Sequence, residues 1–154
     1  MINSIKIISG GQSGVDRAAL DFALKFGIAC GGWCPKGRKA EDGQIDKKYP
    51  LKEASDASYE TRTKLNVLES DGTLILFEGE MDAGTRLTFN LAQEMNKPVL
   101  AIDLSGNKDS IFQKIYNWIN FNYLEIINIA GPRESNSSGI YVKTFNFLEE
   151  LFED

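Results

Sequence analysis

Residues 5–17 read Ile5-Lys6-Ile7-Ile8-Ser9-Gly10-Gly11-Gln12-Ser13-Gly14-Val15-Asp16-Arg17, a β-branched run followed by a glycine-rich turn. The β-branched run is typical of a short buried strand that ends at the glycines. Apolar residues then recur at helical spacing from Val15 to Phe26, and Gly27 stands where α-helices commonly end. A strand, a tight turn and a helix in this order form the first half of a βαβ unit.

The remainder of the chain repeats this alternation. Strands are predicted at 28–33, 72–77, 98–103 and 125–130, and helices at 53–69, 85–95, 110–121 and 139–152. The last helix is expected to bury one face that carries Val142, Phe145, Leu148 and Leu151. Residues 35–50 are rich in glycine and charge without periodicity, which is typical of a functional or mobile loop. Residues 1–154 are therefore predicted to be a single Rossmann-like α/β domain, three layers with a mainly parallel sheet flanked by helices.

Composition narrows the classes of function. The chain has 154 residues, of which 42% are hydrophobic and 25% charged, and its formal net charge is −5. This charge disfavours a broad nucleic-acid-binding face. No apolar run approaches the roughly 18 residues that cross a bilayer, and the first residues lack the pattern of a secretory signal. We therefore expect a cytoplasmic protein with no nucleic-acid or membrane partner.

Histidine is absent, and this excludes several kinds of chemistry. A Ser-His-Asp triad, a Cys-His pair and a histidine-ligated zinc site all require it. The two cysteines, Cys30 and Cys34, do not form a Cys-x-x-C motif and are expected to be reduced thiols in or near the core. Alternatively, Cys34 lies near a ligand, because it stands in the glycine-containing segment 31–37. No metal site is predicted, and acid-base chemistry would need carboxylates, lysine, tyrosine, cysteine or the ligand itself.

Three loops are candidates for ligand binding, because open parallel sheets bind ligands beyond the carboxyl ends of their strands. Residues 10–17 place small residues and unpaired N–H groups at the start of a helix, which suits an anion; a tight turn without a ligand is the alternative. The turn is neither the dinucleotide fingerprint nor a P-loop. Gly84 and Thr85 begin another helix, where Thr85 alternatively acts only as a cap. Arg133 follows the last strand and suits phosphate or carboxylate, with a solvated surface arginine as the alternative.

Two further groups complete the candidate site. Trp33 stands near Lys36 and Arg38, so the indole could stack on a planar ring of the ligand while the two cations bind its phosphate. The alternative is that Trp33 belongs to the core and that the charged side chains are solvated. Arg62 and Asn66 lie one helical turn apart and share a face that points to either the crevice or solvent. The predicted ligand-binding residues are Gly10, Gly11, Gln12, Ser13, Gly14, Arg17, Trp33, Lys36, Arg38, Arg62, Asn66, Gly84, Thr85 and Arg133.

Several ordered blocks resemble the putative molybdenum carrier family, a Rossmann-like group related to the lysine-decarboxylase-like nucleotide phosphoribohydrolases. The blocks span nearly the whole chain and comprise residues 9–21, 31–38, 40–43, 61–62, 66–67, 70–75, 84–85, 130–135 and 139–141. The resemblance implies a ligand of the molybdenum cofactor type, which is a phosphate-bearing pterin (molybdopterin). It also implies a homo-oligomer, a dimer or tetramer, assembled through helices that flank the sheet.

One departure from the related hydrolases bears on catalysis. Those enzymes carry a Gly-Gly-x-Gly-Thr-x-x-Glu motif with a catalytic glutamate, whereas here Thr88 stands at the glutamate's place. Because threonine cannot replace a carboxylate as a base, we expect a binding or carrier protein for a phosphate-bearing ligand, with no catalytic residue. Two alternatives stay open: a nucleotide or nucleoside-phosphate hydrolase that uses Asp16, Glu41 or Asp42, and a nucleotide-sensing module.

Overall fold

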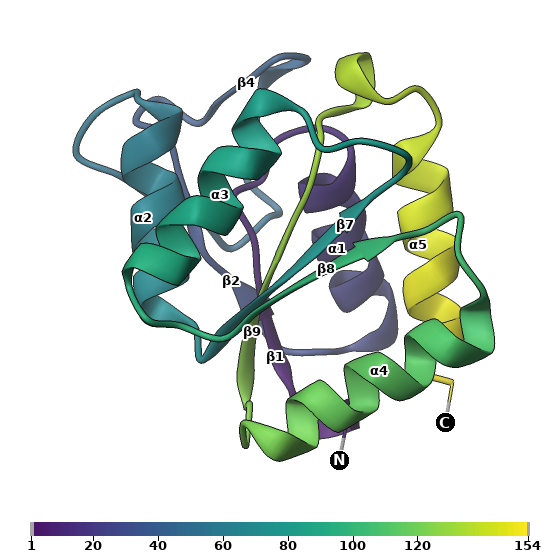
Figure 1. The fold of residues 1–154 in the computed structure, drawn as a ribbon. Helices are drawn as coiled ribbons and strands as arrows, with labels where there is room; N and C mark the ends of the chain where they lie inside the picture. The colour runs from purple at the N-terminus through teal and green to yellow at the C-terminus, as the bar shows by residue number, and fades with distance from the viewer. Residues whose placement is uncertain (1, 154) are drawn as a thin grey trace.

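A five-stranded sheet organises the chain in the computed structural model, which describes residues 2–153 (Figure 1). Its strands are β1 (Lys6–Ile8), β2 (Cys30–Gly31), β7 (Gly72–Phe77), β8 (Val99–Asp103) and β9 (Ile126–Ala130). The helices are α1 (Val15–Phe26), α2 (Tyr59–Glu69), α3 (Ala83–Glu94), α4 (Lys108–Phe121) and α5 (Ile140–Leu151), with short 3₁₀ helices η1 (Ile2–Ser4) and η2 (Glu134–Asn136). Two small sheets pair β3 (Trp33–Cys34) with β6 (Lys52–Glu53), and β4 (Lys39–Ala40) with β5 (Gly43–Gln44).

The strand order of the main sheet is β2-β1-β9-β7-β8, and all neighbours are parallel. The central strand, β9, is therefore the last one in the sequence. Counted from β9 onward, the order becomes 3-2-1-4-5, which is that of an ordinary Rossmann sheet. The chain thus builds the Rossmann arrangement with its first strand and helix moved to the carboxyl-terminal end.

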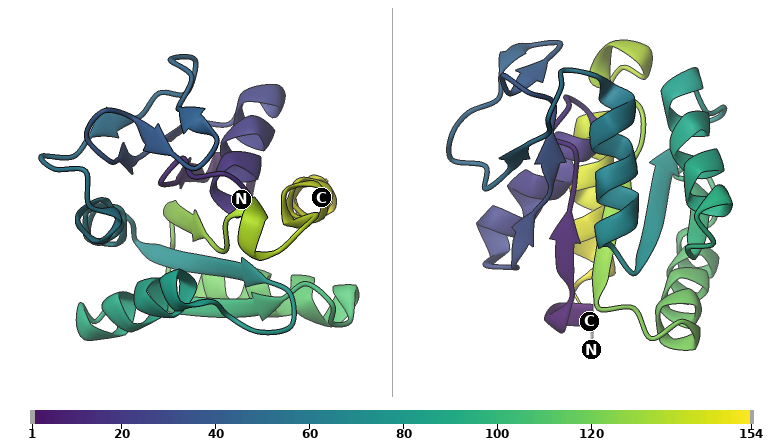
Figure 2. Two further views of the ribbon diagram at one scale, coloured as in Figure 1. Left: turned by 90° about the horizontal axis from the view of Figure 1, so that it is seen from above. Right: turned by 90° about the vertical axis from the view of Figure 1, so that its left-hand side faces the viewer.

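This order places a topological switch point between β9 and β7. The chain leaves β9 through α5, and the sheet continues from β9 to β1 on one side of the switch point. The chain leaves β7 through α3 and enters β8, which lies on the other side of the switch point. Loops that diverge in this way leave a crevice beyond the carboxyl ends of the strands. Figure 2 shows α1 and α5 on one side of the sheet and α3 on the other, and α2 packs against α3. The predicted Rossmann-like three-layer fold is confirmed.

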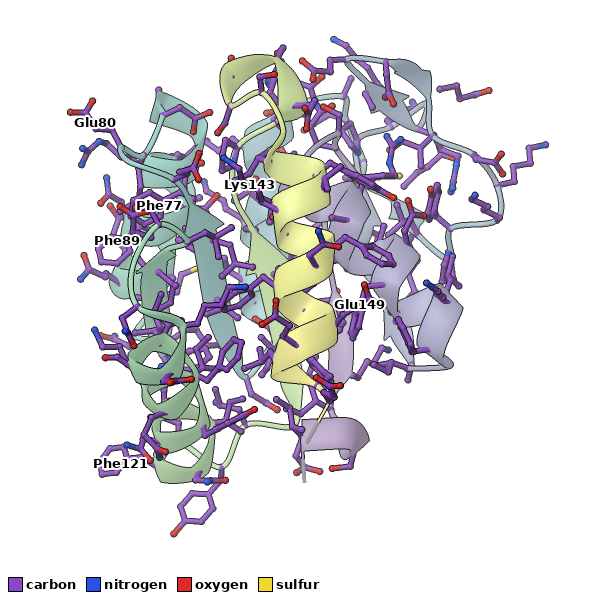
Figure 3. All side chains as sticks on the ribbon, turned by 90° about the vertical axis from the view of Figure 1, so that its right-hand side faces the viewer. Phe77, Glu80, Phe89, Phe121, Lys143 and Glu149 are labelled. Carbon is purple, nitrogen blue, oxygen red and sulfur yellow. The ribbon has the colours of Figure 1, made fainter. Side chains whose placement is uncertain are left out.

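The core explains why the helices dock where they do. Val15, Ala19 and Phe22 of α1 are almost fully buried and join the same cluster as Leu148 of α5. The aromatic ring of Phe112 on α4 lies 5.3 Å from that of Phe147 on α5. Figure 3 shows, by contrast, that Phe121 at the end of α4 points away from the molecule, and it is 83% exposed. None of the described helices is long and apolar enough to cross a membrane.

Several boundaries differ from the sequence-based expectation. The strand predicted at 28–33 is split at Gly32, which adopts a φ of 132° and packs against the Ser9 backbone. The residues before Gly32 form β2 and pair with β1, whereas those after it form β3 and pair with β6. The helix predicted from residue 53 begins only at Tyr59, where the Ser58 hydroxyl caps it by accepting from Glu60 N–H. The irregular segment 35–50 contains the β4–β5 hairpin. Val142 is 58% exposed and lies outside the buried face of α5.

The difference in burial between Val142 and Leu148 provides a matched pair of substitutions on α5. Replacing the fully buried Leu148 by alanine is expected to lower the free energy of unfolding by about 2–5 kcal/mol, because it leaves a cavity among packed side chains. Replacing the exposed Val142 by alanine is expected to change it by less than about 0.5 kcal/mol. Urea unfolding followed by circular dichroism measures both, and equal effects would contradict the packing described for α5.

Candidate functional site

A cavity of about 140 Å³ lies at the switch point, where the three predicted loops meet. Its lining includes Gln12 and Asp16 from the β1–α1 turn, Arg62 from α2, Gly84 and Thr85 from α3, and Arg133 from the loop after β9. These residues are far apart in the sequence. They meet because β1, β7 and β9 are parallel neighbours whose carboxyl ends share one edge of the sheet.

Gln12 lines the cavity, and its hydrogen bonds fix which way its amide group is turned. Its Oε1 accepts two hydrogen bonds, from Ser13 N–H at 3.1 Å and from Glu41 N–H at 2.8 Å. Both partners are donors, so the amide cannot be turned around without placing two donors against its NH₂ group. Gln12 Nε2 is buried and has no hydrogen-bond partner within residues 2–153. Gln12 therefore presents a fixed donor to the cavity.

Arg62 forms the second wall and crosses the glycine-rich turn. Its Nη1 donates to Asp16 Oδ2 at 3.1 Å, and its Nε is buried without a partner in the described part of the chain. A Cβ atom at Gly10 would lie 1.6 Å from Arg62 Nη1, so a side chain at this position would displace the guanidinium. Position 10 must therefore lack a side chain so that the Arg62 guanidinium can cross the glycine-rich turn.

Asp16 is 3% exposed and lines the same cavity. Burial raises the pKa of its carboxyl group, and the neighbouring Arg62 opposes that rise only in part. The carboxylate also accepts from Gln12 N–H at 3.4 Å. Arg62 therefore neutralises Asp16 and, at the lining of the cavity, keeps a buried Nε that has no partner among the described residues.

The start of α3 supplies the third wall. The Asp82 carboxylate caps the helix by accepting from Thr85 N–H at 2.9 Å, and it accepts from Asn136 Nδ2 at 2.8 Å. Thr85 Oγ1 is buried and has no partner that meets hydrogen-bond geometry among the described residues. Thr88 also lines the cavity, but its hydroxyl donates to Gly84 O at 3.2 Å within the same helix.

Three cations gather around one aromatic ring at the mouth of the cavity. The Tyr59 ring has Arg133 at 5.4 Å, Arg62 at 5.5 Å and Lys39 at 5.7 Å from its centroid. Cation–π contacts of this kind are electrostatic attractions to the ring face. They concentrate positive charge at one place on a chain whose net charge is −5.

The tip of the β4–β5 hairpin closes the side of the site. Glu41 accepts hydrogen bonds from the hydroxyl groups of Ser13 and Ser135 and from Ser135 N–H, and Arg133 Nη1 lies 3.9 Å from it. The hydrogen bonds from Ser13 and Ser135 hold the pKa of the Glu41 carboxyl group below its usual value. Arg17 fixes the same tip, because its Nη1 lies 2.9 Å from Asp42 Oδ2.

Three backbone N–H groups of the glycine-rich turn, those of Gly11, Gln12 and Ser13, have partners inside the protein. Gly11 N–H donates to Ser9 Oγ, and Ser13 N–H donates to the Gln12 side chain. Gly14 has a φ of 79° and lies against the Pro132–Glu134 backbone, where a Cβ would be 2.4 Å from Pro132 O. Of residues 10–14, only Gln12 belongs to the described lining of the cavity, and binding of a phosphate by the turn stays a prediction.

Several other predicted residues hold the surrounding loops. Arg38 donates to the carbonyl oxygens of residues 45, 46, 49 and 51, and so fastens the segment after the hairpin. Asn66 pairs with both backbone groups of Trp33, at 2.8 Å and 3.0 Å. Lys36 is exposed, and Arg17 binds Gly11 O. None of these side chains belongs to the described lining of the 140 Å³ cavity.

Sequence reasoning did not assign Tyr59 or Ser135 to the site. Tyr59 stands three residues before Arg62, which places both on one face of α2, and this spacing was the available signal. Ser135 lies in a recognised sequence block, but only the structure shows that it meets Glu41. Both cysteines are free thiols, and residues 2–153 contain no group of three or more acidic or sulfur side chains placed to hold a metal.

The strand order and the switch-point cavity define a circularly permuted Rossmann-like protein. Residues 7–152 match the model of the circularly permutated YpsA SLOG family, and the chain belongs to this family. It is 45% identical to a solved structure described as a putative molybdenum carrier protein from Syntrophus aciditrophicus. The match covers 97% of this chain and 96% of that one, with a TM-score of 0.94, and confirms the family resemblance. A comparison with curated proteins finds no match.

The Glu41 contacts predict a pH-dependent contribution to stability. Because the pKa of Glu41 is lowered from 4.5 in the folded state, the ionised carboxylate stabilises the fold above that pH. The contribution is lost as the pH falls through the lowered value. Glu41→Gln is therefore expected to be less stable than the wild type at pH 7, with a difference that shrinks below pH 4.5. Thermal unfolding across this pH range tests this, with Glu94→Gln at an exposed position of α3 as the control.

Proposed function

We propose that the protein binds and carries a small ligand by holding its phosphate, or a similar oxyanion, in the switch-point cavity. The observation that carries this proposal is that Gln12 and Arg62, which line the same cavity, each have a buried donor nitrogen without a partner, Gln12 Nε2 and Arg62 Nε. A buried donor without an acceptor costs about 1–3 kcal/mol. An acceptor-rich group in the cavity would remove this cost for both nitrogens, and the hydroxyl group of Thr85 lines the same cavity.

The charges favour an anion over a neutral or cationic ligand. Arg62 and Gln12 can only donate at the unpartnered nitrogens, and the cations Arg133 and Lys39 stand at the mouth. Hydrogen bonds between a guanidinium and an anionic oxygen are stronger than neutral ones, at about 1.5–3 kcal/mol each. A local cluster of cations also attracts anions toward an otherwise acidic surface.

The volume limits which part of a ligand can enter. Pockets that enclose a whole drug-sized molecule measure about 300–1,000 Å³, whereas this cavity measures about 140 Å³. Its donors fit the phosphate end of the molybdenum cofactor, and its size leaves the pterin ring outside. The relative from Syntrophus aciditrophicus, with its description as a molybdenum carrier, supports this cofactor as cargo. Molybdate and nucleoside monophosphates share the required anionic oxygens.

Exchanging one atom of Gln12 tests the proposal. In Gln12→Glu one carboxylate oxygen still accepts from Ser13 and Glu41, while the other replaces the NH₂ donor that faces the cavity. The affinity for inorganic phosphate is expected to fall about 100-fold, equivalent to about 2.7 kcal/mol, because a donor becomes a repelling charge. Isothermal titration calorimetry measures this change.

The control is Gln44→Glu, which makes the same exchange at an exposed position of the hairpin. It adds an equal charge outside the cavity and is expected to change phosphate affinity less than about 3-fold. Unchanged affinity in a folded Gln12→Glu variant, or an equal loss in Gln44→Glu, would contradict the proposed site. Titration with molybdate, a pterin phosphate and AMP then ranks the possible cargoes.

A hydrolase is the second candidate, and Asp16 is the observation that favours it. Its carboxyl group lines the cavity and has a raised pKa, as an acid or base in catalysis often does. Two observations argue against a hydrolase. The Oδ2 atom of Asp16 already accepts hydrogen bonds from Arg62 Nη1 and Gln12 N–H, and Thr88 offers no second carboxylate.

Incubation with nucleoside monophosphates distinguishes the two candidates. A carrier is expected to release no free base, as measured by chromatography over several hours. Sustained release that is lost in Asp16→Asn and kept in Asp42→Asn would replace the carrier proposal with a hydrolase. Assembly into a dimer or tetramer stays a prediction from the family resemblance, and a cytoplasmic location stays a prediction from composition.

A further inference from the structure

A second set of donors lies beside the cavity, and the protein's own Glu41 occupies it. Ser13 Oγ, Ser135 Oγ and Ser135 N–H all donate to the Glu41 carboxylate, and Arg133 approaches to 3.9 Å. Two loops, after β1 and after β9, therefore direct three hydrogen bonds and one cation at a single anionic group. The group itself comes from the tip of a hairpin that packs between them.

This donor set stabilises negative charge. Ser13 accepts a hydrogen bond from Glu134 N–H at 3.1 Å, which leaves its own hydroxyl hydrogen to donate to Glu41. The lowered pKa of the Glu41 carboxyl group has the hydrogen bonds from Ser13 and Ser135 as its main causes. A phosphate oxygen has the same acceptor chemistry as a carboxylate oxygen and would use the same donors.

The two donor sets are adjacent. Arg133 belongs to both, since it lines the switch-point cavity and approaches Glu41. Gln12 connects them as well, because its oxygen accepts from Glu41 N–H while its nitrogen faces the cavity. A ligand held at the cavity would therefore have its neighbouring group next to Glu41.

We propose that Ser13, Ser135 and Arg133 form a second anion subsite that Glu41 fills in the free protein, and that the ligand carries two neighbouring anionic groups, as a diphosphate does. This inference rests on the proposed function, because the first anionic group is the one in the switch-point cavity. The ligand displaces the Glu41 side chain when it binds, so that one anion replaces another at the same donors.

The hairpin can release Glu41 without losing its place. Asp42 remains paired with Arg17, whose Nε and Nη2 bind Gly11 O at 3.1 Å and 2.9 Å. The bond from Glu41 N–H to Gln12 uses the backbone and does not depend on the carboxylate. Only the side chain of Glu41 must rotate, and it is partly solvent-accessible at 21%.

Affinities for pyrophosphate and for inorganic phosphate test the proposal when both are measured by calorimetry on the full chain. In Glu41→Ala the second subsite is open, so pyrophosphate is expected to bind at least 10-fold more tightly than it binds the wild type. The gain for inorganic phosphate is expected to be clearly smaller, because a single phosphate cannot occupy both subsites at once. Adding Ser135→Ala to this variant is expected to remove most of the gain, because Ser135 Oγ would be one of the new donors.

The matched control is Asp42→Asn, which removes the neighbouring charge and keeps an amide oxygen that accepts a hydrogen bond from Arg17. An equal gain in Asp42→Asn would show a general charge effect and overturn the subsite, as would equal changes for the two anions in Glu41→Ala. If Glu41→Ala does not fold, Glu41→Gln keeps the size of the side chain and removes its charge, with a smaller gain for pyrophosphate alone expected. Phosphate binding by the wild type with no gain in either variant would refute this inference and leave the proposed function intact, whereas failure of the wild type to bind phosphate would refute both.

Discussion

Arg62 reaches over Gly10 to the buried Asp16, and this ion pair connects α2, the glycine-rich turn and α1 at one point. A buried charge is tolerated only when it is paired and hydrogen-bonded, so each partner constrains where the other can lie. Gly10 must lack a side chain for the pair to form, and α2 must pack close enough for Arg62 to reach. The pair holds the Arg62 guanidinium at the lining of the cavity, where its Nε is buried without a partner among the described residues.

The circular permutation changes the order of the chain and leaves the site in place. A switch-point crevice depends on which strands are neighbours in space and on the direction of their connections, and not on where the chain starts. Here β9 is the last strand and also the central one, so Arg133 near the end of the chain meets Gln12 near its beginning. The recognised blocks at the two ends of the sequence therefore belong to one site.

Charge is distributed unevenly at the site. The chain carries a net charge of −5, but Lys39, Arg62 and Arg133 surround the ring of Tyr59, which lines the cavity. Asp16 balances Arg62, and Glu41 lies beside Arg133 next to the cavity. Under the proposed function, an incoming anion would compete with these carboxylates for the same cations, and this competition would limit its affinity.

The sequence by itself determined the Rossmann-like class, the alternation of strands and helices, and the three loops that carry Gln12, Thr85 and Arg133. These depend on local periodicity and on glycine positions, which can be read along the chain. Only the tertiary structure decided which polar atoms have partners. The N–H groups of Gly11, Gln12 and Ser13 have partners inside the protein, and Arg38 donates to four carbonyl groups. Gln12 Nε2 and Arg62 Nε, in contrast, are buried without partners in two residues that line the cavity. The physical reason is that hydrogen bonds are satisfied by whichever groups packing brings together, and here some partners lie 121 residues apart in the sequence.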